Sequence, residues 1–271
     1  MKTLVKILCL ALAICMCFTC VACGDAKTES KSGEKEKLVM ATNAAFPPYE
    51  YKEGEDFAGI DVEIAGLIAE KLGMELEILD VEFGSIIGGV QSGKYDMGMA
   101  GMTVTDERLK SVNFSDTYAN GIQSVIVKED SQYASFEDFY TGFDDEGNPK
   151  GVKDGIKIGV QQDTTGDIYS SDKPAKWGFG EDNVIRYKTG AEAVMALSSG
   201  KITAVIIDNE PAKSYVESTK GLKILEGEYA NEDYAICVAK ENTELLEKIN
   251  GALKELTEEG KIQEIIDKYI K

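Results

Sequence analysis

Short apolar runs typical of β-strands alternate with longer runs of helical spacing from Leu38 to the C-terminus. In the clearest helical run, residues 60–72, apolar residues recur every three or four positions and Gly73 follows as a natural stop. Residues 202–207 form a nearly continuous apolar run, which is typical of a strand covered on both faces. This alternation predicts a layered α/β fold.

The remaining strands and helices are predicted from the same apolar patterns. Strands are expected at residues 38–42, 75–83, 95–100, 156–161, 184–188 and 234–238. Helices are expected at 85–92, from Thr105 onward, at 191–199 and 209–219, and as a final pair within 245–269. The polar, turn-rich residues 141–155 are expected to form a surface loop. The second half repeats this rhythm, and the 249 residues that remain of 271 after residues 1–22 are enough for two domains.

Residues 1–22 have the pattern of a secretory signal peptide, with two lysines and then an apolar run too short for a typical lone spanning helix. The run ends in Cys20-Val21-Ala22-Cys23-Gly24, which resembles a bacterial lipobox, although Cys20 stands where that motif usually carries an aliphatic residue. The resemblance implies cleavage before Cys23, lipidation of Cys23 and anchoring of the extracytoplasmic protein to the cell membrane. An uncleaved anchor helix would give the same topology.

The chain after the signal is strongly acidic. Residues 23–36 are polar and are expected to be a solvated spacer behind the lipid anchor. Loss of Lys2 and Lys6 with the signal leaves 27 of the 29 Lys and Arg residues against 48 Asp and Glu, a net charge of −21. This charge argues against nucleic acid as a partner and against adsorption to an anionic membrane surface.

The cysteine and histidine content limits which disulfides, metal sites and catalytic sites the chain can form. Of six cysteines, four leave with the signal and Cys23 is the expected lipidation site, so Cys237 stands alone and no intramolecular disulfide is possible. Cys237 lies in an apolar strand pattern and is expected to be structural. The chain has no histidine, so metal binding and Ser-His or Cys-His catalysis lack their usual ligand and base. We therefore predict no metal, no cofactor and no catalytic residues.

Five stretches in order along the chain carry a family resemblance. They are residues 41–51, 59–72, 100–116, 158–167 and 204–212. In the clearest, GIDVEIAGLIAEKL, acidic and aliphatic residues alternate before an apolar helix. Together they resemble the bacterial extracellular solute-binding proteins of family 3, which bind polar amino acids. The resemblance covers about residues 38–269.

The resemblance implies a two-lobed, type II periplasmic-binding-protein fold with two hinge strands. Lobe 1 is expected at residues 37–118 plus 231–271, lobe 2 at 123–226, and the hinge at 119–122 and 227–230. The protein would be a monomer that binds a free amino acid and delivers it to an ABC permease in the membrane. ATP hydrolysis would belong to a separate subunit, since this chain has no phosphate-binding loop.

An amino-acid receptor must hold a carboxylate, and Arg108 is the candidate because a guanidinium meets a carboxylate with two parallel hydrogen bonds. Without the resemblance, Arg108 could equally be a surface residue paired with Asp106 or Glu107. The family's matching arginine binds the α-carboxylate. Thr164 and Thr165, in a turn that follows a strand and opens a helix, are implied to add donors from the other lobe.

The ammonium group of the ligand needs an anion, and Asp208 ends the apolar run 202–207 at the edge where α/β proteins bind ligands. The alternative role for Asp208 is to cap the helix that begins at Asn209. The resemblance implies that the Gly101 carbonyl and the Thr103 hydroxyl also contact the ammonium.

The resemblance implies that Phe46 and Phe83 flank the ligand side chain, with Asn43 and Gln161 at its far end. Core packing is the alternative role for both phenylalanines. With two neutral amides at that end, a glutamine-like ligand is favoured over arginine or lysine, unless Glu50 reaches the pocket and reverses the preference. Two rival functions stay open at this stage. One is a cyclohexadienyl-dehydratase-like lyase on the same fold, and the other is a ligand sensor for a signalling partner.

Overall fold

The computed structural model describes residues 35–270, which belong to one compact unit. The predicted signal peptide, the lipidation site Cys23 and most of the predicted spacer lie outside the described residues. No helix within residues 35–270 is both long and apolar enough to cross a bilayer.

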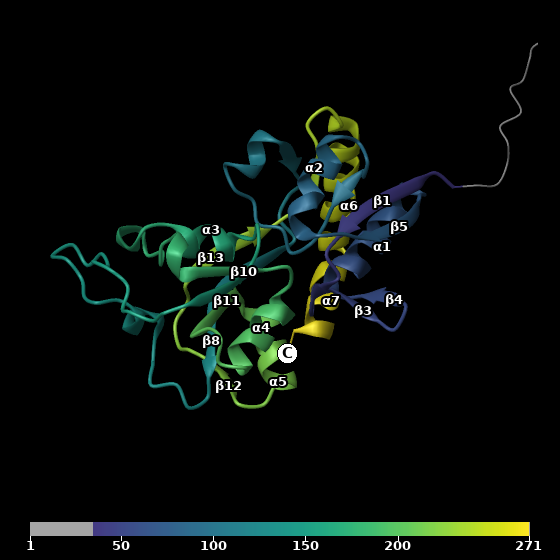
Figure 1. The fold of residues 1–271 in the computed structure, drawn as a ribbon. Coiled ribbons are helices and arrows are strands. Elements are labelled where there is room, and N and C mark those ends of the chain that lie inside the picture. The colour runs from purple at the N-terminus through teal and green to yellow at the C-terminus, as the bar shows by residue number, and fades with distance from the viewer. Residues whose placement is uncertain (1–34, 271) are drawn as a thin grey trace, which may run out of the picture. The chain divides into compact units, whose positions relative to one another are not determined.

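The first sheet has five strands and is built from both ends of the described chain (Figure 1). Its order is β5 (Glu75–Asp80), β1 (Lys37–Thr42), β6 (Met97–Gly98), β14 (Cys237–Ala239) and β7 (Val112–Phe114). Strand β1 runs parallel to β5 and β6, whereas β14 runs antiparallel to β6 and β7. The chain therefore leaves this sheet after β7 and returns to its middle with β14.

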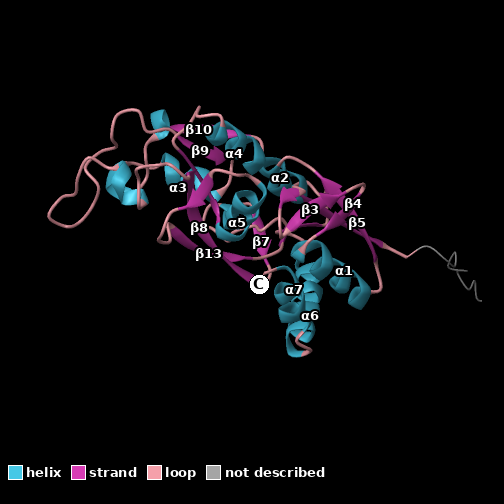
Figure 2. Ribbon diagram, turned by 90° about the horizontal axis from the view of Figure 1, so that it is seen from below, coloured by secondary structure: helices cyan, strands magenta, loops and turns pink. Residues whose placement is uncertain are grey.

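Helices cover both faces of the first sheet. Helices α1 (Ile60–Leu72), α6 (Thr243–Glu258) and α7 (Lys261–Tyr269) pack together, as Figure 2 shows, whereas α2 (Ile86–Gln91) contacts β1, β6, β7 and β14. Along β1, Leu38 and Met40 join the core beneath α1 and α6, and Val39 and Ala41 join the core beneath α2. The period of two in a strand sends successive side chains to these opposite layers.

The second sheet is built from the middle of the chain. Its order is β10 (Val184–Tyr187), β9 (Ile158–Gln161), β11 (Ala204–Asp208), β8 (Ala119–Lys128) and β12 (Leu222–Ile224), with β13 (Ala230–Tyr234) also pairing with β8. Helices α3 (Thr165–Ser171), α4 (Gly190–Ser198) and α5 (Asn209–Ser218) pack on it. Val205 and Ile207 share a core with α4 residues, while Ala204 and Ile206 face an aromatic cluster. A strand covered on both faces is confirmed for residues 204–207, although it begins at Ala204 and not at Ile202 as expected.

Strands β8 and β13 pair antiparallel between the two sheets, from Ala119 opposite Tyr234 to Gln123 opposite Ala230. Residues 119–122 of the predicted hinge lie in β8, and residue 230 opens β13. The predicted lobe and hinge limits stay predictions, but the two crossing segments lie side by side and are tied by a ladder.

Several expected elements differ in detail. The prediction of a single strand at residues 234–238 is wrong. Strand β13 ends at Tyr234 in the second sheet, and β14 starts at Cys237 in the first. The helix expected from Thr105 is reduced to a short 3₁₀ turn, η2 (Arg108–Lys110). The strand expected to reach Phe83 stops at Asp80, and Phe83 opens another 3₁₀ turn, η1 (Phe83–Ser85).

The sequence patterns missed a small third sheet of strands β2 (Ala45–Phe46), β3 (Glu50–Glu53) and β4 (Asp56–Ala58). These strands are too short and too polar for a clear periodicity.

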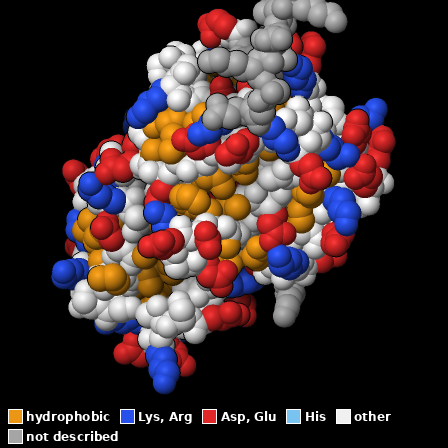
Figure 3. All heavy atoms as spheres, turned by 90° about the vertical axis from the view of Figure 1, so that its right-hand side faces the viewer, with side chains coloured by type: hydrophobic (Ala, Val, Ile, Leu, Met, Phe, Trp, Pro, Cys, Tyr) orange, Lys and Arg blue, Asp and Glu red, His pale blue; other side chains and the backbone are white. Residues whose placement is uncertain are grey.

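On the face of the molecule that Figure 3 shows, acidic and basic side chains are interspersed, with apolar side chains visible between them.

Gly59 lets the chain turn from β4 into α1. Its φ of 122° is in a region that L-residues rarely adopt, and a Cβ there would lie 2.2 Å from the Tyr49 carbonyl oxygen. We predict that Gly59→Ala lowers the free energy of unfolding by about 2 kcal/mol or more, measured by urea denaturation. Gly66→Ala is the matched control, because Gly66 lies inside α1 with open space around it. It should stabilise by about 0.5–1 kcal/mol, and equal effects of the two changes would contradict the account.

Candidate functional site

A narrow, mostly enclosed cavity lies between the ends of the two sheets. Its lining consists of Asn43, Phe46, Glu50, Phe83, Ala100, Gly101, Thr103, Arg108, Gln161, Thr164, Thr165 and Asp208. All ten residues proposed from the sequence as ligand contacts are therefore brought to one cavity, together with Glu50 and Ala100.

Strand ends position most of these side chains. Asn43 follows β1, Gln161 ends β9 and Asp208 ends β11, and each of these strands has a parallel neighbour in its sheet. Carboxyl ends of parallel strands are the usual ligand edge of α/β sheets. Phe83 and Arg108 instead come from the short 3₁₀ turns η1 and η2.

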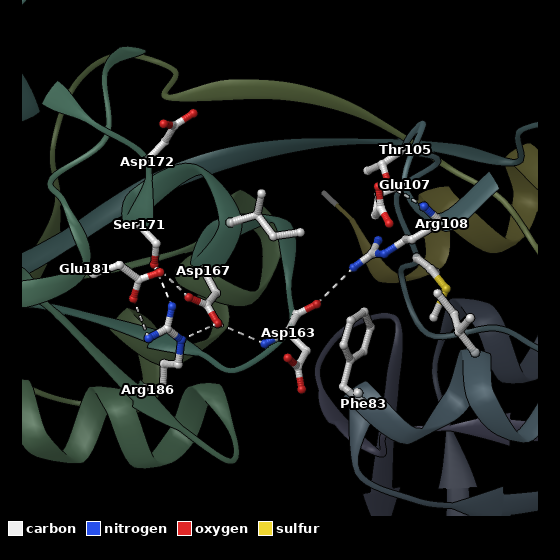
Figure 4. Close-up of a pocket in the computed structure, with 14 residues that line it drawn as sticks. Phe83, Thr105, Glu107, Arg108, Asp163, Asp167, Ser171, Asp172, Glu181 and Arg186 are labelled. Carbon is white, nitrogen blue, oxygen red and sulfur yellow. Dashed lines mark hydrogen bonds and ion pairs between the residues drawn. The ribbon is translucent and has the colours of Figure 1, made fainter. Parts of the chain in front are cut away.

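Arg108 is buried, with 8% of its surface exposed, and has no carboxylate within ion-pair distance among the residues that the structure describes. Its Nη1 donates to the Thr103 carbonyl at 2.8 Å, and its Nη2 donates to the Asp163 carbonyl at 3.2 Å. The guanidinium also lies over the Phe83 ring, 5.3 Å from the centroid (Figure 4). The alternative pairing with Glu107 does not occur, because Glu107 bonds Lys110.

Burial lowers the pKa of Arg108, yet a guanidinium stays charged at neutral pH. A buried charge requires a partner, and the two carbonyl oxygens offer only dipoles. Arg108 therefore has capacity for an anion on the cavity side.

Asp208 is the buried acid on the opposite sheet, with 7% of its surface exposed. Its side chain makes no capping hydrogen bond to α5, so the helix-cap alternative does not explain it. Its Oδ1 accepts a hydrogen bond from the Tyr234 hydroxyl. Burial, and then the nearby Glu232 carboxylate, raise the pKa of Asp208. A cation placed beside this carboxylate would relieve both effects.

The two threonines of the turn before α3 have different surroundings. Thr164 Oγ1 donates to the Gln161 carbonyl at 2.8 Å and accepts from the Asp167 N–H at 3.3 Å, so its hydroxyl serves as a helix cap. Thr165 is buried, and its Oγ1 lies 3.4 Å from Thr103 Oγ1 across the cavity. Thr165 is therefore better placed than Thr164 to offer its side chain to a ligand.

The two amides expected at the side-chain end are hydrogen-bonded to each other. Gln161 Nε2 donates to Asn43 Oδ1 at 2.8 Å, and Asn43 Nδ2 donates to the Val81 carbonyl at 2.8 Å. Both residues are buried. Because these groups already satisfy one another, they offer a ligand fewer free atoms than the sequence suggests.

Glu50 is the acid that the sequence left undecided, and it does line the cavity. Only 1% of its surface is exposed, and its Oε2 has no hydrogen-bond partner. The neighbouring Asp61, on α1, accepts from the Gly101 N–H at 2.8 Å. Burial, and then the charge of Asp61, raise the pKa of Glu50 well above its usual range, and burial raises the pKa of Asp61 to about 7.

No periodicity marked Glu50, because it lies on the short strand β3 that the sequence patterns missed. Glu232 and Tyr234, which influence Asp208, were missed for a related reason: they belong to β13, whose pairing with β8 is a long-range contact.

Comparison with known proteins agrees with this architecture. The profile of the bacterial extracellular solute-binding proteins, family 3, matches residues 38–271. The chain is 33% identical to the arginine-binding extracellular protein ArtP of Bacillus subtilis (strain 168), over 97% of each chain. An ancestral arginine-binding protein solved with arginine is 36% identical, with a TM-score of 0.76 over 88% of this chain and all of that one. An ancestral arginine-binding protein solved with glutamine is also 36% identical, with a TM-score of 0.75 over 88% of this chain and 99% of that one.

A further solved relative is the ancestral amino acid-binding protein AncCDT-1, described as a precursor of cyclohexadienyl dehydratase. It is 28% identical, with a TM-score of 0.75 over 87% of this chain and 96% of that one. The structural neighbours share the two-lobed fold expected from the sequence. With its family profile, its relatives and its fold in agreement, this chain belongs to the bacterial extracellular solute-binding proteins of family 3.

Proposed function

We propose that this protein is the extracytoplasmic receptor that delivers a free amino acid to an ABC importer. The observation that carries the proposal is the cavity in which Arg108, without a carboxylate partner in the described chain, faces the same enclosed space as Asp208 from the other sheet. An α-amino acid carries both complementary charges on one carbon. Its carboxylate would pair with the buried charge of Arg108, and its ammonium would favour the ionised form of Asp208, whose pKa is otherwise raised, which neither a simple anion nor a simple cation can do.

Closure of the two lobes would couple binding to transport. The ligand would contact Arg108, Phe46 and Phe83 on the first lobe and Thr165 and Asp208 on the second. An open form makes only half of these contacts, so the ligand favours the closed form through its differential affinity. The closed form would then dock on the membrane permease.

Glu50 supports a cationic side chain on the ligand, with L-arginine as the first candidate. A guanidinium or ammonium group beside Glu50 would supply a positive charge next to a carboxyl group that lines the cavity and has a second acid, the buried Asp61, as its neighbour. The arginine-binding names of similar proteins agree with this choice.

Glutamine is the second candidate, as the sequence favoured. The neutral pair Asn43 and Gln161 forms one wall, and a protonated Glu50 could donate to an amide oxygen. The relative solved with glutamine shares the fold. The preference for a glutamine-like ligand stays a prediction.

We further propose a monomer tethered by a lipidated Cys23, with binding rather than turnover as its activity. The two rival functions have separate tests. A lyase would convert its ligand, which product analysis after prolonged incubation would detect. A sensor would act through a signalling partner instead of a permease, and loss of uptake after deletion of the gene would argue against it.

The proposal is tested by a thermal-shift screen of a chain beginning at Asp25 against the twenty amino acids. A ligand that binds only the native state stabilises it by about 2.7 kcal/mol at a hundredfold excess over Kd. We expect a large shift with one or two amino acids, L-arginine or L-glutamine among them. No shift with any amino acid would contradict the receptor function.

Arg108→Ala should weaken binding of that amino acid by about 2–5 kcal/mol, measured by titration calorimetry, because the ligand carboxylate loses its charged partner. Lys110→Ala is the matched control. Lys110 lies two residues away, is exposed and pairs only with Glu107, so affinity should stay unchanged. Retained affinity in Arg108→Ala would remove Arg108 from the site.

Glu50→Gln separates the two candidate ligands. If L-arginine is bound, its affinity should fall by about 1.5–3 kcal/mol, the value of a hydrogen bond to a charged group, while affinity for L-glutamine changes little. Glu53→Gln, at the exposed end of the same strand, is the control. An unchanged affinity for L-arginine would contradict a role for Glu50 in ligand selection.

The raised pKa values of Glu50, Asp61 and Asp208 make stability depend on pH. Between their unfolded pKa, near 4, and their raised folded pKa, the folded protein binds more protons than the unfolded chain. The free energy of unfolding of the ligand-free protein should therefore fall as pH rises from about 5 to about 8. Denaturant titrations should show this slope and a smaller slope for Glu50→Gln. Stability that rises with pH over this range would contradict the burial of these carboxyl groups.

A further inference from the structure

Both arginines of the sequence, Arg108 and Arg186, line one groove next to the ligand cavity (Figure 4). They come from different sheets, since Arg108 opens the turn η2 before β7 and Arg186 belongs to β10. The chain carries almost all its positive charge on lysine, and both of its guanidinium groups line this one groove. Only Arg108 reaches the ligand cavity.

A continuous set of contacts joins the two. Arg186 Nε donates to Asp167 Oδ2 at 2.8 Å, and the same oxygen accepts from the Asp163 N–H at 3.1 Å. The Asp163 carbonyl then accepts from Arg108 Nη2 at 3.2 Å. In Figure 4 these side chains follow one another across the groove.

Asp163, which joins Asp167 to Arg108, has an unusual backbone conformation. Its φ of 66° is left-handed, which is uncommon for a residue with a side chain. The bond from its N–H to Asp167 fixes this peptide, and the conformation directs its carbonyl at Arg108. Asp163 therefore depends on where the Asp167 carboxylate is held.

Arg186 holds that carboxylate from several sides. Besides its bond to Asp167, its Nη1 pairs with Glu181 at 2.9 Å and its Nη2 donates to Ser171 Oγ at 2.9 Å. Ser171 Oγ in turn donates to Asp167 Oδ1 at 3.0 Å. Asp167 is buried and is thereby fixed at both oxygens. A planar fork can make these three contacts together, whereas lysine, with one nitrogen, cannot.

We propose that Arg186 is a positioning residue for the ligand carboxylate: through Asp167 and the Asp163 carbonyl, it orients Arg108 when the two lobes meet. The inference rests on the proposed function, in which Arg108 binds the carboxylate. Without the Asp163 contact, Nη2 of Arg108 would be free to turn away from the plane that a carboxylate requires. Among residues 35–270, the guanidinium of Arg108 has a hydrogen bond within its own lobe only at Nη1, to the Thr103 carbonyl.

The test compares L-arginine with agmatine, which lacks the α-carboxylate, on the chain beginning at Asp25. Arg186→Gln should weaken L-arginine binding about tenfold, chiefly through faster dissociation, as expected for coupled residues. Its affinity for agmatine should equal that of the wild type. Arg186→Lys should restore part of the loss, because one ion pair with Asp167 can form. Lys176→Gln is the charge-matched control in the same lobe, since it removes only an exposed pair with Asp172.

A second readout does not depend on affinity. In ¹⁵N spectra the wild type gives two arginine Nε–Hε signals, and Arg186→Gln leaves Arg108 alone, which assigns it. The Arg108 signal should differ between the two proteins, with and without L-arginine, and should not move in Lys176→Gln. An unmoved Arg108 signal, or equal losses of L-arginine and agmatine affinity, would overturn the inference. Failure of the wild type to bind L-arginine would contradict the proposed ligand, and the Arg108 signal would still decide the positioning role.

Discussion

The unpaired charge of Arg108 is the constraint on which the rest of the site depends. A buried guanidinium without a charged partner is costly, yet the described chain gives Arg108 only carbonyl oxygens and the face of Phe83. The cavity beside it is closed on its other side by Asp208, which is also buried. A ligand carboxylate would pair with the Arg108 charge, and a ligand ammonium would favour the ionised form of Asp208, so an α-amino acid satisfies both groups.

A ligand can contact both Arg108 and Asp208 only in the space between the two sheets. Strand ends at Asn43, Gln161 and Asp208 face one space, and strands β8 and β13 cross between the sheets as a paired ladder. Hydrogen bonds already cross the cavity, from Gln161 to Asn43 and from Arg108 to Asp163. An ion pair between Lys188 and Glu82 and a hydrogen bond from the Tyr215 hydroxyl to the Ala45 carbonyl also join the two sides, and one apolar core contains residues of both sheets.

The sequence predicted most of the fold because its longest elements have strong periodicity. Helix α1 begins and ends as expected, with Gly73 in the left-handed conformation at its C-terminus. Short elements were lost: β2, β3 and β4 have too few residues for a pattern, and the boundary between β13 and β14 depends on which sheet each strand joins. Local sequence does not contain that information.

The ligand site, like the fold, could be predicted only in part from the sequence. Arg108 was identifiable because the chain has only two arginines and this one lies in a family motif, and Asp208 because it ends an apolar strand. The role of Glu50 was left open because burial, not residue type, gives it meaning, and the Asn43–Gln161 bond joins residues 118 positions apart. The part played by Arg186 depends on a left-handed residue, Asp163, whose conformation no sequence pattern indicated.

The most direct test of the central claim is a crystal structure of the protein grown with L-arginine. We expect one molecule in the cavity, with its carboxylate on Arg108, its ammonium beside Asp208 and its side chain directed toward Glu50. An amino acid found outside this cavity, or bound inside it with the carboxylate away from Arg108, would contradict the account.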